Sequence, residues 1–227
     1  MILNDTAYNS ITMKTILFDN DGTLVDSESL YFKATQQVLR SAGVDITKKW
    51  FAEEFLLLNT STLSLARAKG LTGEQIDTLR NQRNTLYTKL LEDEVILMPG
   101  VFDVLQQLHG QYDMGVVTGS RRNHFEIIMK KTGIKKFFNF YITREDTEKE
   151  KPDPEPYLKA LQVSWKKPHE CIAIEDTSKW LLSASRANIP CLVIPNELSK
   201  DHDFSLATKI VWKFSEITSY LLENRYS

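Results

Sequence analysis

The sequence predicts an α/β protein with a parallel sheet core and an inserted helical bundle. From residue 98 onwards, apolar segments of strand length alternate with segments whose apolar residues recur at helical spacing. This alternation is typical of a parallel sheet with helices on both faces, because each parallel strand needs a crossover connection to reach the next. Between residues 27 and 95 the spacing is helical throughout, and glycines divide the stretch into several helices that would pack together.

The first element is a short strand at residues 14–18, Lys-Thr-Ile-Leu-Phe, which is rich in β-prone residues. It stops at a turn-rich acidic segment that begins at Asp19. Residues 1–12 have no clear period, and we interpret them as an N-terminal extension. The predicted organisation is a core formed by residues 13–26 and 96–227, with residues 27–95 inserted as a helical domain.

The later elements alternate up to residue 194. Apolar residues at helical spacing predict helices, and continuous apolar runs such as Cys-Leu-Val-Ile predict buried strands. In chain order the sequence predicts a helix over 101–109, a strand over 113–117, a helix through Ile127, a strand over 140–142, a helix from Pro154, a strand over 171–174, a helix near Leu181 and a strand over 191–194.

Composition narrows the range of functions. The chain has 28 basic and 30 acidic residues, a net charge of −2 without a long single-sign stretch, which argues against nucleic acid or an anionic membrane as the main partner. Cys171 and Cys191 lie in apolar runs and are expected to be buried free thiols. The sequence shows neither a leader pattern nor an apolar stretch of about 20 residues. We therefore expect a cytosolic protein, monomeric or weakly dimeric, that acts on a small molecule.

Polar residues gather where the predicted strands end. Ligands of parallel α/β sheets bind outside the carboxyl ends of the strands, so these residues would share one rim. The rim would offer carboxylates, an amine, hydroxyls and free backbone amides. Its residues are Asp19 and Asp21 after the first strand, Thr118, Gly119 and Ser120 after the second, Lys151 in the loop after the third, and Glu175 and Asp176 after the fourth.

The two aspartates after the first strand suit phosphoryl transfer. Asp19 and Asp21 are two residues apart, and Gly22 lets the chain turn so that their roles can separate. One carboxylate, Asp19, would attack phosphorus and form an aspartyl-phosphate. The other, Asp21, would protonate the leaving oxygen and then activate the water that hydrolyses the intermediate.

A cation is expected beside these carboxylates. At an effective dielectric of about 20, each close pair of like charges costs on the order of 4 kcal/mol, so a phosphoester cannot approach the rim without one. Hard oxygen ligands indicate Mg²⁺. Asp19 and Asp176 are the expected side-chain ligands, and Asp21, through its carbonyl, and Glu175 are further candidates.

The remaining rim residues would hold the phosphate. Lys151 would neutralise charge on the nucleophile and on the phosphate oxygens. The Thr118 hydroxyl and the backbone amides around Gly119 and Ser120 would bind the same oxygens, so that electrostatic positioning supplies most of the rate.

Together these segments resemble the four motifs of the haloacid dehalogenase superfamily in order and spacing. The resemblance covers nearly the whole chain from Lys14, and it implies a Rossmann-like core with a helical cap, inserted after the first motif, that closes over the substrate. The subgroup it most resembles contains phosphoglycolate phosphatase and β-phosphoglucomutase. The matching segments are 18–28 (Phe-Asp-Asn-Asp-Gly-Thr-Leu-Val-Asp-Ser-Glu), 116–120 (Val-Val-Thr-Gly-Ser), 151–154 (Lys-Pro-Asp-Pro) with Tyr157, and 174–177 (Ile-Glu-Asp-Thr).

The sequence departs from the family pattern at glycine positions. Trp180 and Glu150 stand where the family commonly has glycine, and Asn59 falls where many cap domains place a glycine in a substrate-specificity loop. Asn188 also replaces a glycine at a helix end, and asparagine can adopt the left-handed conformation needed there. We expect Trp180 to crowd the cap interface or narrow the site.

The leading hypothesis is a phosphatase for a small phosphoester such as a sugar phosphate or phosphoglycolate. In the family, an acid at the position of Asp21 disfavours dehalogenase and phosphonatase chemistry. The first alternative is a phosphomutase, in which a bisphosphate intermediate returns its phosphoryl group to Asp19. The second is a binding protein that kept the fold without turnover, which the change to Trp180 motivates.

Overall fold

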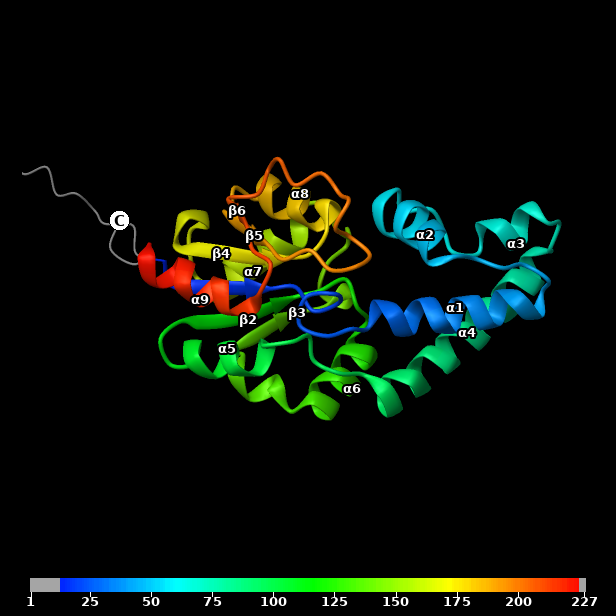
Figure 1. Cartoon of the computed structure of the whole chain (residues 1–227), viewed down its shortest axis with the longest axis horizontal. Coiled ribbons are helices and arrows are strands. Elements are labelled where there is room, and N and C mark those ends of the chain that lie inside the picture. Colours follow the sequence, from blue (N-terminus) through cyan, green and yellow to red (C-terminus); the bar gives the residue numbers. More distant parts are fainter. Residues whose placement is uncertain (1–12, 225–227) are drawn as a thin grey trace, which may run out of the picture.

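A computed structural model of the chain describes residues 13–224 as a six-stranded sheet, helices on both of its faces, and a helical insert at one end (Figure 1). The expected N-terminal extension, residues 1–12, lies outside the described residues. Neighbouring strands are parallel in the order β3-β2-β1-β4-β5-β6. The strands are β1 (Thr15–Phe18), β2 (Asp113–Val117), β3 (Phe140–Ile142), β4 (Cys171–Glu175), β5 (Cys191–Val193) and β6 (Lys209–Ile210).

β1 lies in the middle of the sheet, and its residues are all fully buried. Such a strand is apolar on both faces because helices cover both. Phe18, its last residue, pairs with Val116 of β2 on one side and with Ile174 of β4 on the other. The three strands therefore end at nearly the same level, and the residues that follow them share one edge of the sheet.

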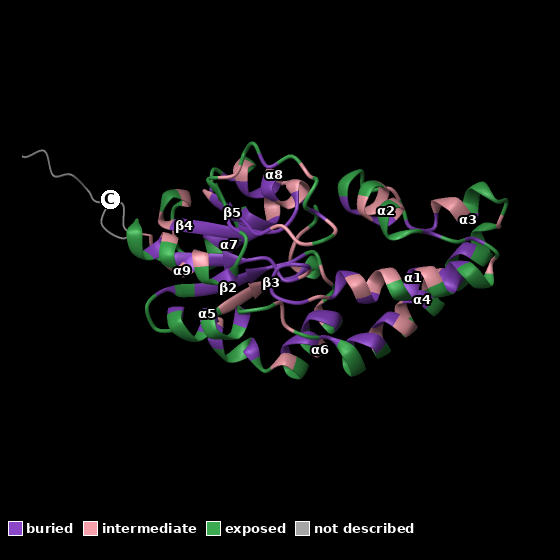
Figure 2. Cartoon of the chain, viewed as in Figure 1, coloured by how far each residue is buried: buried purple, intermediate pink, exposed green. Residues whose placement is uncertain are grey.

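Two helical layers enclose the sheet. α5 (Val101–Leu108), α6 (Arg122–Thr132) and α9 (Phe214–Glu223) pack against one face, and α7 (Glu155–Ser164) and α8 (Ser178–Arg186) pack against the other. Figure 2 shows the buried central strands β1, β2 and β4 between these layers and the exposed outer surfaces of the helices. Short 3₁₀ turns complete the connections at η2 (Ile134–Phe137), η3 (Arg144–Asp146) and η4 (Pro168–Glu170).

The insert between β1 and α5 is helical and has its own apolar cluster, which includes Leu39, Phe51 and Ile76. We call it the cap. Its longest helix begins with a capping box between Thr72 and Gln75, which satisfies free backbone amides of the first turn. The cap elements are α1 (Glu28–Ser41), α2 (Lys48–Trp50), the π-helix η1 (Phe51–Leu57), α3 (Ser64–Ala68) and α4 (Gly73–Glu94).

The two chain segments that join the cap to the core run side by side. Val25 and Leu97 form an antiparallel bridge. The Asp26 amide donates to the Ile96 carbonyl at 3.1 Å, and the Met98 amide donates to the Leu24 carbonyl at 3.0 Å. We call residues 24–26 and 96–98 the paired linkers.

The predicted fold class is confirmed, including the helical cap and the strands over 113–117 and 140–142. Cys171 and Cys191 are buried free thiols, as expected. The sequence predicts no strand or helix beyond residue 194, so β6 and α9 are elements that only the structure reveals. β6 is too short to show a period, whereas α9 carries apolar residues at helical spacing.

Candidate active site

The turn after β1 places Asp19 and Asp21 at the carboxyl edge of the sheet. The Asp19 amide donates to the Ile174 carbonyl at 2.9 Å, which extends the pairing with β4 by one residue. The chain then turns back on itself, since the Gly22 amide donates to the Val25 carbonyl at 2.9 Å. Asp19 is 1% exposed, whereas Asp21 is only half-buried, so the two carboxyl groups occupy different environments.

Gly22 lies where three polar side chains converge. Its φ of +79° is unfavourable for residues with a side chain. A Cβ at this position would collide with Asp176 Oδ2, and it would lie 2.9 Å from both Asn196 Nδ2 and Glu28 Oε2. The position therefore needs glycine for space as well as for backbone conformation.

Lys151 is 3% exposed and holds the expected nucleophile. Its Nζ donates to Asp19 Oδ1 at 2.8 Å, to Glu175 Oε1 at 2.7 Å and to the Val117 carbonyl at 2.8 Å. The Tyr157 hydroxyl donates to the same Glu175 oxygen. All three ammonium hydrogens are thus engaged by protein acceptors, and the lysine fixes the Asp19 carboxylate against the end of β2.

Hydroxyl groups surround Asp21. Thr118 Oγ1 and Ser120 Oγ donate to Asp21 Oδ2 at 2.9 and 2.7 Å, and Ser27 Oγ donates to Asp21 Oδ1 at 2.5 Å. The Ser120 amide donates to Thr118 Oγ1 at 2.9 Å, which shapes the loop around Gly119. Residues from the first and second predicted motifs are therefore in direct contact.

A divalent cation fits the other side of Asp19. Asp19, Glu175 and Asp176 each offer a carboxylate oxygen, and these atoms lie within 4.8 Å of one another. Asp19 Oδ2, Glu175 Oε2 and Asp176 Oδ1 are buried and have no hydrogen-bond partner among the described residues. Unpaired buried carboxylate oxygens are costly, and a hard cation is the group that satisfies them.

The acidic cluster perturbs its own ionisation. Burial raises the pKa of Asp19, and the charges of Glu175 and Asp21 raise it further against the opposing effect of Lys151. Burial and the charges of Glu28 and Asp19 likewise raise the pKa of Asp176. Burial alone would lower the pKa of Lys151, but Asp19 and Glu175 outweigh it, so the amine stays charged. The cluster thus favours a bound cation electrostatically.

The cap contacts the core beside this cluster. Lys179 at the start of α8 donates to Asn59 Oδ1 at the end of η1, and its Nζ lies 4.2 Å from the centre of the Trp180 ring. Trp180 is also 5.6 Å from Lys151 Nζ. The Trp180 ring therefore lies beside the amines of both Lys151 and Lys179, next to the buried cluster. Burial, with the nearby charge of Lys151, lowers the pKa of Lys179 to about 8.

The family's other glycine positions are accommodated without strain. Asn59 and Asn188 adopt left-handed conformations, with φ of 59° and 57°. Asparagine tolerates this region better than other residues with side chains. Glu150 pairs with Arg144 at the surface and takes no part in the acidic cluster.

The structure gathers all the predicted rim residues at one edge. The buried cluster consists of Asp19, Lys151, Glu175 and Asp176. Beside it, the hydroxyls of Thr118 and Ser120 contact Asp21, and Gly119 lies between these two residues in the loop. Sequence reasoning included Glu28 and Tyr157 in the family-like segments without giving them a role, and it did not single out Asn196. Asn196 could have been found, because it follows the predicted strand 191–194 as the other rim residues follow theirs.

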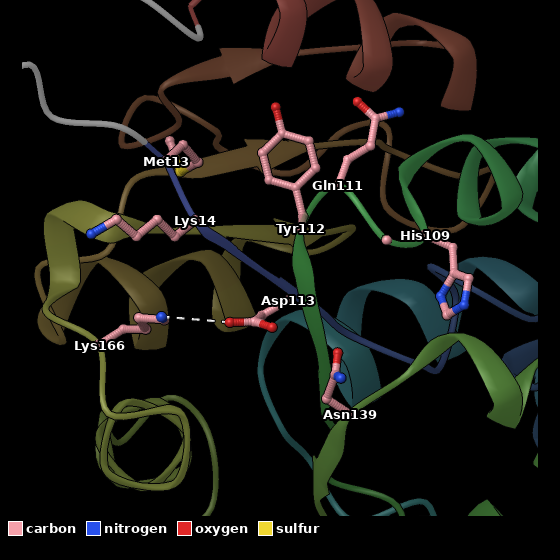
Figure 3. Close-up of a pocket in the computed structure, with 9 residues that line it drawn as sticks. Met13, Lys14, His109, Gln111, Tyr112, Asp113, Asn139 and Lys166 are labelled. Atoms are coloured by element: carbon pink, nitrogen blue, oxygen red, sulfur yellow. Dashed lines mark ion pairs between the residues drawn. The ribbon is translucent and has the colours of Figure 1, made fainter.

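A cavity of about 410 Å³ lies at the opposite, amino-terminal edge of the sheet (Figure 3). Its charged side chains are already paired, Lys14 with Glu170 and Lys166 with Asp113. No metal-binding cluster is found there within residues 13–224. Its size therefore does not make it the catalytic site.

A parallel sheet whose strand ends gather carboxylates around one lysine suits an enzyme that binds a phosphate ester beside a cation. The family model of haloacid dehalogenase-like hydrolases matches residues 16–194. The chain belongs to this family, and it is an enzyme of the phosphatase type.

Individual relatives are similar over most of their length. The pyrophosphatase PpaX of Bacillus pumilus is 30% identical over 181 residues, which are 79% of this chain and 82% of PpaX. The crystal structure of CbbY from Rhodobacter sphaeroides in complex with phosphate has a TM-score of 0.77 at 23% identity, covering 90% of this chain and 96% of CbbY. β-Phosphoglucomutase from Clostridium difficile also has a TM-score of 0.77, at 20% identity, covering 94% and 97%. The two structures show the same fold.

No helix in the described part of the chain has the length and hydropathy needed to cross a membrane.

Proposed function

We propose that the protein is a Mg²⁺-dependent phosphatase that hydrolyses a small phosphorylated metabolite of the sugar phosphate type through an aspartyl-phosphate on Asp19. The observation that carries this proposal is the environment of the Asp19 carboxylate. Lys151 holds one of its oxygens, and the other is buried without a partner among the described residues. Because Lys151 fixes this carboxylate, Asp19 Oδ1 can attack phosphorus without reorienting first, while Oδ2 is left for the cation.

The chemistry divides between two aspartates. Asp19 attacks phosphorus, an O–P bond forms as the ester O–P bond breaks, and Asp21 gives a proton to the leaving oxygen. Water then transfers a proton to Asp21 and attacks the aspartyl-phosphate, which releases inorganic phosphate and restores Asp19. Thr118 and Ser120, whose hydroxyls contact Asp21, can turn to the phosphate oxygens when substrate is bound.

Asp19, Asp176 and Glu175 would hold the cation, with Asp21 contributing its carbonyl. When bound, Mg²⁺ would neutralise the carboxylates and the transferring phosphate. Lys151 keeps the nucleophile oriented, and in the geometry described it acts through Asp19 because its donors are already engaged. We propose residues 13–26 and 96–227 as the catalytic core and 27–95 as the cap. The cytosolic location and the monomeric or weakly dimeric state stay predictions.

A phosphomutase is the second candidate, favoured by the likeness to β-phosphoglucomutase. A mutant of CbbY from Rhodobacter sphaeroides has been crystallised as a complex with xylulose-1,5-bisphosphate, so this fold accommodates a bisphosphate in a related protein. Hydrolysis and mutase chemistry share the first step on Asp19. They differ in whether water or a second substrate hydroxyl accepts the phosphoryl group.

The test measures inorganic phosphate released from sugar phosphates, phosphoglycolate and nucleotides, with Mg²⁺ or with EDTA. We expect release by the wild type, loss of release with EDTA, and loss in Asp19→Asn. The matched control is Asp113→Asn, which changes an aspartate at the other edge of the sheet and should keep wild-type release. If a sugar phosphate isomerises without phosphate release when a bisphosphate is supplied, the mutase replaces the phosphatase.

A further inference from the structure

Asn196 is the first polar residue after β5, and it connects three turns at the rim. Its Nδ2 donates to Asp176 Oδ2 at 2.8 Å and to the Gly22 carbonyl at 3.2 Å. Asp176 belongs to the turn after β4, and Gly22 belongs to the turn after β1. One half-buried side-chain amide thus ties the end of β5 to residues that follow β4, its neighbour in the sheet, and β1, the strand beyond β4.

The loop fixes which way this amide faces. The Leu198 amide donates to Asn196 Oδ1 at 2.8 Å, so the carbonyl end of the side chain is occupied by the loop itself. The backbone amide of Asn196 donates to Ser199 Oγ at 3.1 Å, and Ser199 is fully buried. The NH₂ end must therefore face the carboxylate, because the reverse orientation would place two acceptors against each other.

The hydrogen bond from Asn196 makes the two carboxylate oxygens of Asp176 differ in their surroundings. Oδ2 accepts from Asn196, whereas Oδ1 is buried and has no partner among the described residues. Asp19 shows the same division, with Oδ1 held by Lys151 and Oδ2 without a partner in the described chain. Two carboxylates are thus each held by one oxygen, which leaves the other for the same cation.

We propose that Asn196 is a positioning residue for the cation site, which orients the Asp176 carboxylate so that Oδ1 is presented to the ion. The inference rests on the proposed function, because it concerns the same cation. Neighbours that orient a metal ligand commonly change metal affinity about 10–100-fold when they are removed. Asn196 contributes no ligand atom, and its effect acts through Asp176.

The test titrates the full chain with Mn²⁺ and follows bound and free ion by electron paramagnetic resonance. The Kd of Asn196→Ala should rise about 10–100-fold over that of the wild type. The matched control, Asn139→Ala, removes an asparagine side chain that accepts from the Met114 amide at the opposite edge of the sheet, and its Kd should stay close to the wild-type value. An unchanged Kd in Asn196→Ala overturns the inference.

Circular dichroism melting without metal checks that each variant is folded. Asn196→Ser is the second variant, because its hydroxyl is too short to replace the amide, and it should lose affinity as Asn196→Ala does. Mn²⁺ binding by the wild type must itself be lost in Asp176→Asn. If the wild type binds no Mn²⁺ at this site, the proposed cation dependence fails together with the inference. If the wild type binds and Asn196→Ala binds equally well, only the role of Asn196 fails.

Discussion

At the scale of single residues, the site concentrates buried negative charge. Asp19, Asp176 and Glu28 are all buried, and Glu28 and Asp176 both crowd the α-carbon of Gly22. Lys151 supplies a buried positive charge at Asp19 and Glu175. Glu28 has no such partner among the described residues at its Oε2. The cluster therefore carries an electrostatic cost that depends on pH and on bound cations.

Glu28→Gln should stabilise the cation-free protein at high pH. Burial raises the pKa of Glu28, and the charges of Asp21 and Asp19 raise it further. A carboxyl group whose pKa is higher in the folded state binds more protons there, so the free energy of unfolding falls as the pH rises from about 4.3 towards the raised value. Above this window the variant should be more stable than the wild type, by about 1.4 kcal/mol for each factor of ten by which folding weakens the acidity of Glu28.

Urea unfolding in EDTA, repeated across a series of pH values, measures this difference. The matched control is Glu92→Gln, which alters an exposed glutamate on α4 and should follow the wild-type profile. A profile for Glu28→Gln that coincides with the wild type at every pH would show that Glu28 carries no excess charge energy.

The identities of the rim residues could be predicted from the strand positions alone, because ligands of parallel α/β sheets bind beyond the carboxyl ends of the strands. The burial of Lys151 could not be predicted in this way. The lysine lies in a charged stretch of the sequence, and only the pairing of β1 with β2 and β4 brings Asp19, Val117 and Glu175 around its amine.

At the scale of elements, α1 and α4 of the cap pack into the core cluster, whereas the part of the cap around η1 meets the core through a few specific side chains. Lys179 of α8 reaches Asn59 at the end of η1. The loop after β5 contributes Leu198, which packs against the cap cluster, and Glu197, whose carboxylate lies 3.6 Å from the Lys48 amine. Exposed ion pairs of that kind contribute little, so the Lys179 hydrogen bond is the more informative contact.

Lys179→Met should loosen η1 from the core. Methionine keeps an unbranched side chain beside Trp180 but cannot donate to Asn59. Amide hydrogen exchange should become faster in Phe51–Leu57 and stay unchanged in α9. The matched control is Lys33→Met, because Lys33 pairs with Glu94 within the cap at 2.8 Å and does not reach the core. Equal exchange in η1 for both variants would contradict the proposed contact.

The character of η1 was beyond the sequence pattern. Apolar residues at helical spacing predicted a helix through this stretch, yet the Leu58 amide donates to the Glu53 carbonyl five residues back. Such wide turns are uncommon and depend on tertiary surroundings rather than on local preference. Asn59, two residues after η1, adopts a left-handed conformation, and its side chain accepts a hydrogen bond from Lys179.

At the scale of the whole molecule, the acidic cluster links cation binding to folding. Asp19 and Asp176 come from turns after different strands, and they meet only when β1 and β4 are paired. A cation bound to both therefore stabilises the folded chain and not the unfolded one. The cost of gathering the carboxylates would be offset by the ion.

Mg²⁺ should raise the melting temperature of the wild type and leave that of Asp176→Asn nearly unchanged. At about 100 times its Kd, a ligand adds about 2.7 kcal/mol. For a chain of this size that free energy corresponds to a rise of roughly 5–10 °C. Differential scanning calorimetry in Mg²⁺ and in NaCl at equal ionic strength measures the effect. The same rise in both salts would attribute it to ionic strength instead of to the site.

The paired linkers bring both ends of the cap to one place on the core. Because residues 26 and 96 are hydrogen-bonded neighbours, the entry and exit of the cap occupy adjacent points on the core surface. An insert with such adjoining ends can change in length or sequence without rerouting any strand. Recognition of the organic part of a substrate could then diversify by exchange of this segment, while the acid-lined rim stays fixed in the strand ends.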